Sequence, residues 1–285
     1  MCGISGVVGL KNISELLFEG IRNLEYRGYD SCGVALMNKT HLIIKKDIGG
    51  VEEFYRKHNV LQQKSKIGIA HTRWATHGKV TQGNTHPFTS RDGNFAVVHN
   101  GIISNYRPLR DLLKKEGFKF SSETDTEVVA HLLEKFFKRS QNPEKALVKT
   151  LNLIEGTFAL AFVCTYLPDQ IFCAKQQSPL MLGIGDEINF VGSDFNAFID
   201  HTKNAVILDD GEYAILSRDS YVVKNIANED EVAKPITKIE WDSETSKKKG
   251  YPHYMLKEIY EQPQTISNAL DLEPSELEEV VEMFA

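Results

Sequence analysis

Long apolar runs, clusters of basic residues and secretion signals are all missing from this sequence. No stretch approaches the roughly 18 apolar residues of a membrane-spanning helix, and the opening residues lack the basic and apolar segments of a signal peptide. The formal net charge is −6, with acidic and basic residues spread along the chain. Without a basic patch the sequence points neither to nucleic acid nor to a membrane surface, and we expect a cytoplasmic protein.

Cysteine is scarce too, and neither cysteine nor histidine shows the spacing of a metal site. The four cysteines lie far apart, at Cys2, Cys32, Cys164 and Cys173. In a reducing compartment such cysteines stay free. Several histidines lack both an i, i+4 helical spacing and a paired thiol or carboxylate: they are His71, His77, His86 and His99. We therefore predict no disulfide framework, no metal and no cofactor.

The 285 residues, of which 41% are apolar, suffice for one large or two small domains. Short apolar segments predict strands at 2–10, 34–37, 41–45, 67–70, 95–99 and 157–164. Helical spacing predicts helices at 14–26, around 109–113, after a capping box at Thr124 and Glu127, and at 143–154. Because the segment 157–164 is apolar on both faces, we expect an α+β fold with two stacked sheets between helical layers.

Polar and charged residues crowd together at 241–249 and predict a domain boundary there. The main domain should span residues 1–240. Residues 241–285 carry an apolar pattern but are too few for a domain, and the chain is expected to stop where another domain would begin. A second capping pattern, Ser275 to Glu278, predicts an acidic helix near this end.

Cys2 can act as a nucleophile if Met1 is removed, which a small second residue permits. Its thiol and α-amine would then have reference pKa values of about 8.5 and about 8, so the amine can take the thiol proton. A retained Met1 would place that amine in a peptide bond and remove the base. Gly3 could leave space for a substrate. Taken alone, however, the dipeptide favours a plain buried cysteine at the start of a strand.

The segment His71–Gly78 follows a predicted strand, so it should form a loop at the strand end. Arg73 in this loop can hold a carboxylate with two hydrogen bonds, and nearby hydroxyls and His77 supply further donors. A polar surface loop is an equally good interpretation of the segment alone, because loops at strand ends commonly carry both surface and binding groups.

Two further segments carry polar groups at expected element ends. Asn100 and Gly101 follow a strand, and a side-chain amide beside a backbone N–H can form an oxyanion hole; a hairpin turn is the favoured interpretation of Asn-Gly alone. Asp125 stands on the first turn of a predicted helix, where a carboxylate can bind an ammonium group. Alone, it is better explained by the helix dipole, which favours acidic residues there.

Together these segments supply a nucleophile, a base, an oxyanion hole and clamps for a carboxylate and an ammonium group. On these motifs the sequence resembles the N-terminal glutaminase domain of the glutamine–fructose-6-phosphate aminotransferase family, a class II (N-terminal nucleophile) glutamine amidotransferase. The motifs are Cys2-Gly-Ile, Leu24-Glu-Tyr-Arg-Gly-Tyr-Asp-Ser31, His71-Thr-Arg-Trp-Ala-Thr-His-Gly78, Val98-His-Asn-Gly-Ile102, Ser122-Glu-Thr-Asp-Thr-Glu127 and His253-Tyr-Met-Leu-Lys-Glu-Ile-Tyr-Glu-Gln-Pro263.

The resemblance implies that Cys2 attacks the side-chain amide of L-glutamine, with its own amine as the base. It implies that Asn100 and the Gly101 N–H stabilise the oxyanion. Arg73 would hold the substrate α-carboxylate, and Asp125 would take the α-ammonium group.

Four more residues receive roles by the same resemblance. Thr76 and His77 would lie beside the carboxylate clamp, Arg27 would sit in a loop that closes over the site, and Trp74 would gate an ammonia channel.

The resemblance also implies a four-layer αββα sandwich of the N-terminal-nucleophile hydrolase type. Ammonia would pass to a sugar-isomerase half, absent here, that converts fructose 6-phosphate to glucosamine 6-phosphate. The full-length enzyme would be a homo-oligomer, whereas this chain would only hydrolyse glutamine.

Two alternatives stay open. The first is another N-terminal-nucleophile amidotransferase, of the phosphoribosyl-pyrophosphate or asparagine-forming kind; the Tyr26–Asp30 and Arg73–His77 blocks argue against it. The second is a regulatory module that keeps the fold but has a blocked Cys2.

Overall fold

The computed structural model describes residues 2–75, 79–240, 250–251, 254–270 and 281. The chain divides into two compact units, residues 1–240 and 241–285. The described part of the second unit is mainly the helix α7 (Tyr254–Leu270), which contains Pro263. No helix in these ranges is long and apolar enough to cross a lipid bilayer. The acidic helix predicted near Ser275 lies outside the described residues.

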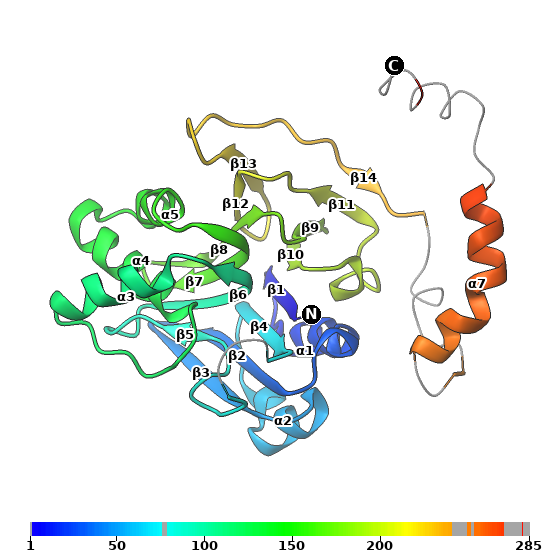
Figure 1. Ribbon diagram of the computed structural model, residues 1–285, viewed down its shortest axis with the longest axis horizontal. Coiled ribbons are helices and arrows are strands. Elements are labelled where there is room, and N and C mark those ends of the chain that lie inside the picture. Colours follow the sequence, from blue (N-terminus) through cyan, green and yellow to red (C-terminus); the bar gives the residue numbers. More distant parts are fainter. Residues whose placement is uncertain (1, 76–78, 241–249, 252–253, 271–280, 282–285) are drawn as a thin grey trace. The chain divides into compact units, whose positions relative to one another are not determined.

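The first unit contains two sheets, both shown in Figure 1. The order of the eight-stranded sheet is β14 (Thr237–Lys238), β11 (Asn204–Ile207), β9 (Met181–Ile184), β10 (Ile188–Gly192), β1 (Gly3–Gly9), β4 (Ile67–Arg73), β2 (Ser31–Asn38) and β3 (His41–Ile48). The order of the six-stranded sheet is β13 (Tyr221–Asn225), β12 (Glu212–Leu216), β8 (Leu167–Gln176), β7 (Gly156–Cys164), β6 (Phe95–Ile103) and β5 (Phe88–Thr89).

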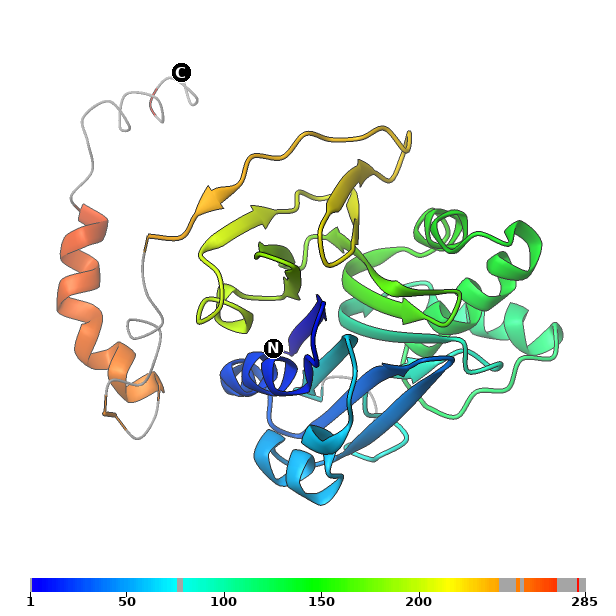
Figure 2. The ribbon, with the colours of Figure 1, turned by 180° about the vertical axis from the view of Figure 1, so that it is seen from behind.

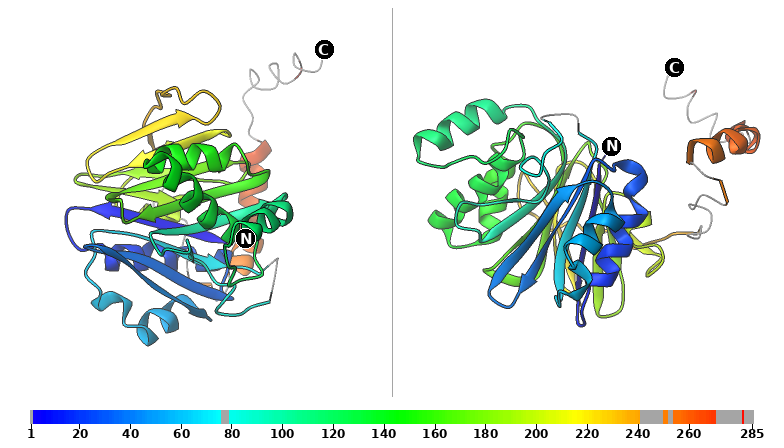
Figure 3. Two further views of the ribbon diagram at one scale, coloured as in Figure 1. Left: turned by 90° about the vertical axis from the view of Figure 1, so that its left-hand side faces the viewer. Right: turned by 90° about the horizontal axis from the view of Figure 1, so that it is seen from below.

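Helices cover the outer faces of the two sheets. On the eight-stranded sheet lie α1 (Ser14–Asn23), η1 (Glu25–Arg27), α2 (Val51–Lys57), η2 (Val60–Gln62) and η3 (Phe195–Ala197). On the six-stranded sheet lie α3 (Tyr106–Lys115), α4 (Glu127–Ser140) and α5 (Pro143–Leu151). The end-on view in Figure 3 (right) shows α1 and α2 in blue on one side and α3 to α5 in green on the other.

Three apolar clusters account for this layering. One lies between the sheets and includes Ile4, Val98 and Ala161. Another packs α3, α4 and α5 on the six-stranded sheet, and the third packs α1 and α2 on the eight-stranded sheet. Each sheet is therefore buried on both faces, which explains why β7 is apolar and buried at every position from Phe158 to Cys164. These are the αββα layers that the sequence predicts.

The start of β1 is the point where the functional segments meet. All seven residues of β1 are buried, because the strand pairs with β4 on one side and β10 on the other. The antiparallel register places Gly3 opposite Thr72, and Ser31 at the start of β2 opposite Arg73 at the end of β4. Figure 2 shows the N-terminus at the start of β1, beside α1. Cys2 therefore lies next to the residues that end β4.

Several local predictions were wrong for identifiable reasons. The first helix ends at Asn23 rather than Tyr26, because the chain tightens into the 3-10 turn η1. No turn forms at Asn100-Gly101; β6 continues to Ile103 and pairs with β7 throughout.

The predicted capping box is also absent. The helix α4 begins at Glu127 after Thr126, without a side-chain cap. The Glu127 carboxylate instead accepts hydrogen bonds from the backbone N–H and hydroxyl groups of Ser121 and Ser122, at 2.7 to 2.8 Å. It thereby fixes the loop that leads to Asp125.

We predict that Glu127→Gln lowers the free energy of unfolding by about 1–3 kcal/mol at pH 7, because a buried ionised acceptor is lost. Burial alone raises the pKa of Glu127, but hydrogen bonds from His131, Ser121 and Ser122 outweigh it and lower the pKa to about 2. The unfolded-state pKa is about 4.3. The stabilisation is therefore fully present above about pH 4.3 and is lost as the pH falls toward 2.

Urea unfolding of both proteins between pH 7 and pH 3 measures this difference, which should shrink as the pH falls. The control is Glu52→Gln on the exposed face of α2, for which no such change is expected. A difference that stays constant over this range would contradict the assigned ionisation of Glu127.

Candidate active site

The thiol of Cys2 lies at the open end of β1 and is partly exposed. Its Sγ donates to the Trp74 carbonyl at 3.6 Å and accepts from the Trp74 N–H at 3.3 Å. Burial raises the pKa of this thiol, and Asp30 adds to the rise, although the Trp74 N–H and the Arg73 charge oppose it. The thiol is therefore protonated at neutral pH, and nucleophilic attack requires a base. Among the described residues, no side chain hydrogen bonds to Sγ.

The carbonyl oxygen of Cys2 accepts two hydrogen bonds from different parts of the fold. Arg27 Nε lies 3.3 Å away and Asn100 Nδ2 lies 3.1 Å away. Arg27 belongs to η1, and its Nη1 forms a 3.0 Å ion pair with Asp194, which also accepts from the Tyr26 hydroxyl at 2.9 Å. These contacts fix the backbone that carries the thiol.

Gly3, which follows the thiol, serves packing rather than substrate access. A Cβ at this position would lie 2.7 Å from Thr72 Oγ1 and 2.8 Å from Leu24 Cβ. The space beside Gly3 is thus already filled by Leu24, which follows α1, and by Thr72 of β4, contrary to our expectation that it stays open for a substrate.

Asn100 and Gly101 approach Cys2 from the six-stranded sheet. The Asn100 amide can donate two hydrogens; one is given to the Cys2 carbonyl, and the second can serve an oxygen atom in the site. Gly101 has φ of +125°, and a Cβ on it would lie 2.1 Å from the Thr157 carbonyl oxygen. Only glycine fits this strand position, where it lines the pocket beside Cys2.

Opposite charges face the same pocket. Arg73, at the end of β4, and Asp125, just before α4, both line the pocket and are only 4% and 8% exposed. Asp125 Oδ2 accepts from the Ile103 N–H at 2.7 Å, which ties the carboxylate to β6. Burial lowers the pKa of Arg73, and the charges of Cys2, Asp30 and Asp125 oppose that change. Arginine nevertheless keeps its charge, so the pocket offers one cationic and one anionic group.

Trp74 forms an exposed wall of this pocket. Its side chain is 44% exposed and makes an edge-on contact with Tyr29, with ring centroids 5.6 Å apart. The chain beyond it is held by Asp30, whose carboxylate accepts from the Ala75 N–H at 2.8 Å. Thr76 and His77, which the sequence places in this site, lie outside the described residues.

The structure thus brings Cys2, Arg73, Trp74, Gly101 and Asp125 around one pocket. Asn100 and Arg27 join them through the Cys2 carbonyl. The pocket is small, with a free volume of about 40 Å³.

Behind the pocket lies a buried polar cluster. Sequence reasoning considered its three histidines only as metal ligands and missed their contacts with Thr126. The cluster consists of His71, His86, His99 and Thr126, of which His86, His99 and Thr126 also line the pocket. Thr126 Oγ1 lies 3.1 Å from His86 Nε2 and 2.9 Å from His99 Nδ1. The four residues come from four separate segments, so no sequence spacing could have revealed the cluster. Among the described residues, no group of three or more potential ligands is placed to bind a metal ion.

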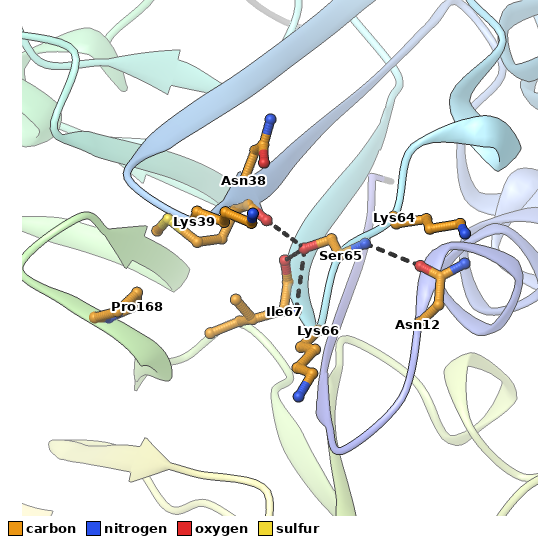
Figure 4. A pocket seen from close by; sticks show the side chains of 9 residues that line it. Asn12, Asn38, Lys39, Lys64, Ser65, Lys66, Ile67 and Pro168 are labelled. Carbon is orange, nitrogen blue, oxygen red and sulfur yellow. Dashed lines mark hydrogen bonds between the residues drawn. The ribbon is translucent and has the colours of Figure 1, made fainter.

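A larger pocket, of about 520 Å³, opens near the start of β4, whereas the candidate site lies at the end of that strand. Figure 4 shows that Lys39, Lys64 and Lys66 surround it. Its hydroxyl group, Ser65 Oγ, is already bonded to the carbonyl oxygens of Met37 and Ile67, at 2.8 and 2.7 Å. With no thiol or carboxylate side chain in its lining, this pocket lacks the chemistry of the Cys2 site.

Comparison with known proteins identifies the class. Residues 71–200 match the family model described as a glutamine amidotransferase domain, a range that begins within β4 and includes Arg73, Asn100 and Asp125. The chain therefore carries a glutamine amidotransferase domain.

The particular relatives are glutamine–fructose-6-phosphate aminotransferases (isomerizing). The chain is 47% identical to that of Thermococcus kodakarensis over 270 residues, covering 95% of this chain and 45% of the relative. It is 46% identical to that of Aquifex aeolicus, again covering 95% and 45%. The resemblance stated from the motifs is thereby confirmed. The chain spans about half the length of these curated relatives.

A solved structure supports the fold. The glutamine phosphoribosylpyrophosphate amidotransferase of B. subtilis is 24% identical, with a TM-score of 0.69, and the match covers 80% of this chain and 50% of the other. The predicted α+β sandwich is confirmed by this likeness together with the two helix-covered sheets.

An unfavourable backbone conformation alone costs about 1–3 kcal/mol. We predict that Gly101→Ala destabilises the protein by more than this. The added Cβ would also force β6 away from the Thr157 carbonyl oxygen. Gly93→Ala is the matched control, since Gly93 also has a positive φ, of +73°, but has open space around it. Thermal or urea unfolding compares the two variants; equal losses of stability would contradict the packing argument.

Proposed function

We propose that this chain hydrolyses L-glutamine to glutamate and ammonia, with Cys2 as the nucleophile. The observation that carries the proposal is the shared pocket: the Cys2 thiol, the Arg73 guanidinium, the Asp125 carboxylate and the Gly101 backbone all line it. An amino acid presents a carboxylate, an ammonium group and, in glutamine, a side-chain amide. The pocket offers a chemical partner for each.

The reaction proceeds in two halves. Cys2 Sγ attacks the side-chain amide carbon, and the carbonyl oxygen becomes an oxyanion held by the Asn100 Nδ2–H and the Gly101 N–H. The C–N bond then breaks, the nitrogen takes a proton and leaves as ammonia, and a thioester remains. Water attacks this thioester, which releases glutamate and returns the proton to the thiol.

The base in the first half is the α-amine of Cys2, freed by removal of Met1. The raised pKa of the thiol supports this assignment, because the site does not ionise Cys2 by itself. The described contacts of Sγ are both with the Trp74 backbone, which offers no base.

Charge complementarity orients the substrate. Arg73 binds the α-carboxylate through two parallel hydrogen bonds, and Asp125 binds the α-ammonium group. We assign Thr76 and His77 to the carboxylate side of the pocket. Since the free volume of the pocket is only about 40 Å³, we expect entry of glutamine to move Trp74 or the segment of Arg27, and Arg27 belongs to the part that closes over the substrate.

In the complete protein, the ammonia serves a second half. The relatives are named as aminotransferases that use glutamine and fructose 6-phosphate, and this chain covers 45% of the T. kodakarensis protein. We assign residues 1–240 to glutamine hydrolysis and residues 241–285 to the linker and the start of a sugar-isomerase half. Glucosamine 6-phosphate is then the product of an oligomeric full-length enzyme, and Trp74 gates the passage of ammonia.

We predict that Cys2→Ala abolishes glutamate release, because no other group in the pocket can form the thioester. A coupled glutamate assay measures turnover, and intact mass establishes that Met1 is absent. Cys173→Ala, at a buried position in β8, is the matched control and should keep turnover. Full turnover by Cys2→Ala would exclude the mechanism. A wild-type chain that lacks Met1 and still releases no glutamate would instead favour the regulatory module.

Arg73→Ala should raise KM for glutamine by about 10–100-fold with little change in kcat, because a charge-assisted hydrogen bond of about 1.5–3 kcal/mol is lost from substrate binding. Arg73→Lys should be intermediate, since lysine offers a point charge without the paired geometry. Arg218→Ala is the control, because Arg218 is exposed and pairs with its neighbour Asp219. Unchanged KM in Arg73→Ala would remove this residue from the carboxylate clamp.

A further inference from the structure

His71 lies in β4, two residues before Arg73, and its side chain points into the space between the sheets. It is fully buried. Its Nε2 lies 3.0 Å from Asn100 Oδ1 and 3.1 Å from the His99 carbonyl oxygen. Its ring packs against that of His86, with centroids 4.0 Å apart. His71 of the eight-stranded sheet thus contacts the Asn100 amide of the six-stranded sheet, and this amide faces Cys2.

These contacts determine the tautomer of His71. Both neighbours of Nε2 are oxygen atoms, and the His99 carbonyl oxygen can only accept a hydrogen bond. Nε2 therefore carries the proton, and Nδ1 does not. Burial lowers the pKa of His71 to about 3, although its hydrogen bonds to Asn100 and to the His99 carbonyl oppose the change, and the positive charge of Arg73 adds to the lowering. The imidazole is neutral at physiological pH and donates through Nε2 alone.

The same contact determines the orientation of the Asn100 amide. An amide can be turned by half a rotation, which exchanges its oxygen and nitrogen. With Oδ1 accepting from His71, Nδ2 must face the Cys2 carbonyl, to which it donates at 3.1 Å. The opposite orientation would place two acceptors against each other at Cys2 and two donors against each other at His71. His71 thus excludes the orientation in which the amide oxygen faces the site.

We propose that His71 is a positioning residue that holds the Asn100 side-chain amide with its N–H groups toward the oxyanion. The inference rests on the proposed glutamine hydrolysis, because it assigns His71 to the rate of that reaction. His71 touches neither the thiol nor the substrate and acts through Asn100. The effect therefore belongs to kcat, since an oxyanion forms only after the substrate has bound.

The experiment compares two substitutions that differ in where they place an amide donor. The longer side chain in His71→Gln carries its N–H near the former position of Nε2, whereas the shorter one in His71→Asn does not reach Asn100. Loss of a whole oxyanion donor costs about 10²–10³-fold in rate. We expect His71→Asn to lower kcat by about tenfold or more with KM changed less than threefold, and His71→Gln to recover most of the rate.

A double-mutant cycle separates positioning from general structure. Asn100→Ala should lower kcat by about 10²–10³-fold, and adding His71→Asn to it should lower kcat no further. His41→Asn, at the exposed start of β3, is the control and should leave kcat unchanged. A loss of kcat in His71→Asn that persists at the same size in the Asn100→Ala background would overturn the proposal, as would an equal loss in His71→Gln.

A second measurement does not depend on turnover. In the wild-type chain, the side-chain amide protons of Asn100 should give resolved, exchange-protected NMR signals; protection should fall in His71→Asn and return in His71→Gln. Unchanged protection in His71→Asn would overturn the positioning role even if the chain showed no activity. Absence of glutamate release by the wild type, with these amide signals as expected, would instead overturn the proposed function alone.

Discussion

The carbonyl oxygen of Cys2 is the point on which the site depends, because both sheets meet there. Arg27 reaches it from the helical layer of the eight-stranded sheet, and Asn100 reaches it from the six-stranded sheet. The residue is also the first before a strand that is buried along its whole length. A chain terminus is ordinarily loosely held, and here two hydrogen bonds and a central strand hold the thiol against Trp74.

The electrostatics of the pocket explain why the Cys2 thiol stays protonated unless a base removes its proton. Burial raises the pKa of Cys2, and the nearby Asp30 charge adds to this, so the Arg73 charge does not suffice to ionise it. The neighbouring histidines are kept neutral by burial, with the pKa of His71 near 3. In the proposed mechanism, a free α-amine on Cys2 supplies the proton acceptor that these groups do not, so that mechanism depends on removal of Met1.

How much the sequence could predict depended on whether a signal was local. The layered α+β fold was readable because doubly apolar strands such as 157–164 require cover on both faces. Cys2, Arg73 and Asp125 could be named because each is a reactive or charged group at the end of a predicted element. Their proximity was not derivable from spacing, since it arises from the register of β1 against β4 and from the packing of one sheet on the other.

Where rules based on local sequence predicted the wrong structure, a contact with a distant part of the chain had replaced the expected local contact. Asn100-Gly101 has the composition of a turn, yet β7 pairs with it through Ala159 and Phe158 and keeps it in a strand. Glu127 has the spacing of a capping box, yet its carboxylate binds Ser121 and Ser122 instead of closing on Thr124. Both departures lie next to groups that line the pocket, and local rules are expected to fail where function imposes its own geometry.

The candidate site is divided between the two sheets, so the packing between the sheets determines the geometry of the site as well as the stability of the fold. The thiol and Arg73 belong to the eight-stranded sheet, whereas Asn100, Gly101 and Asp125 belong to the six-stranded sheet and the start of α4. The apolar cluster between the sheets, which includes Ile4 and Val98, holds these two halves of the site in place. Because packed interfaces shift between discrete arrangements rather than deform smoothly, a change in this cluster should alter the distance between Cys2 and the Asn100 amide. The inner core therefore helps to set the geometry of the proposed site, although none of its apolar side chains lines the pocket.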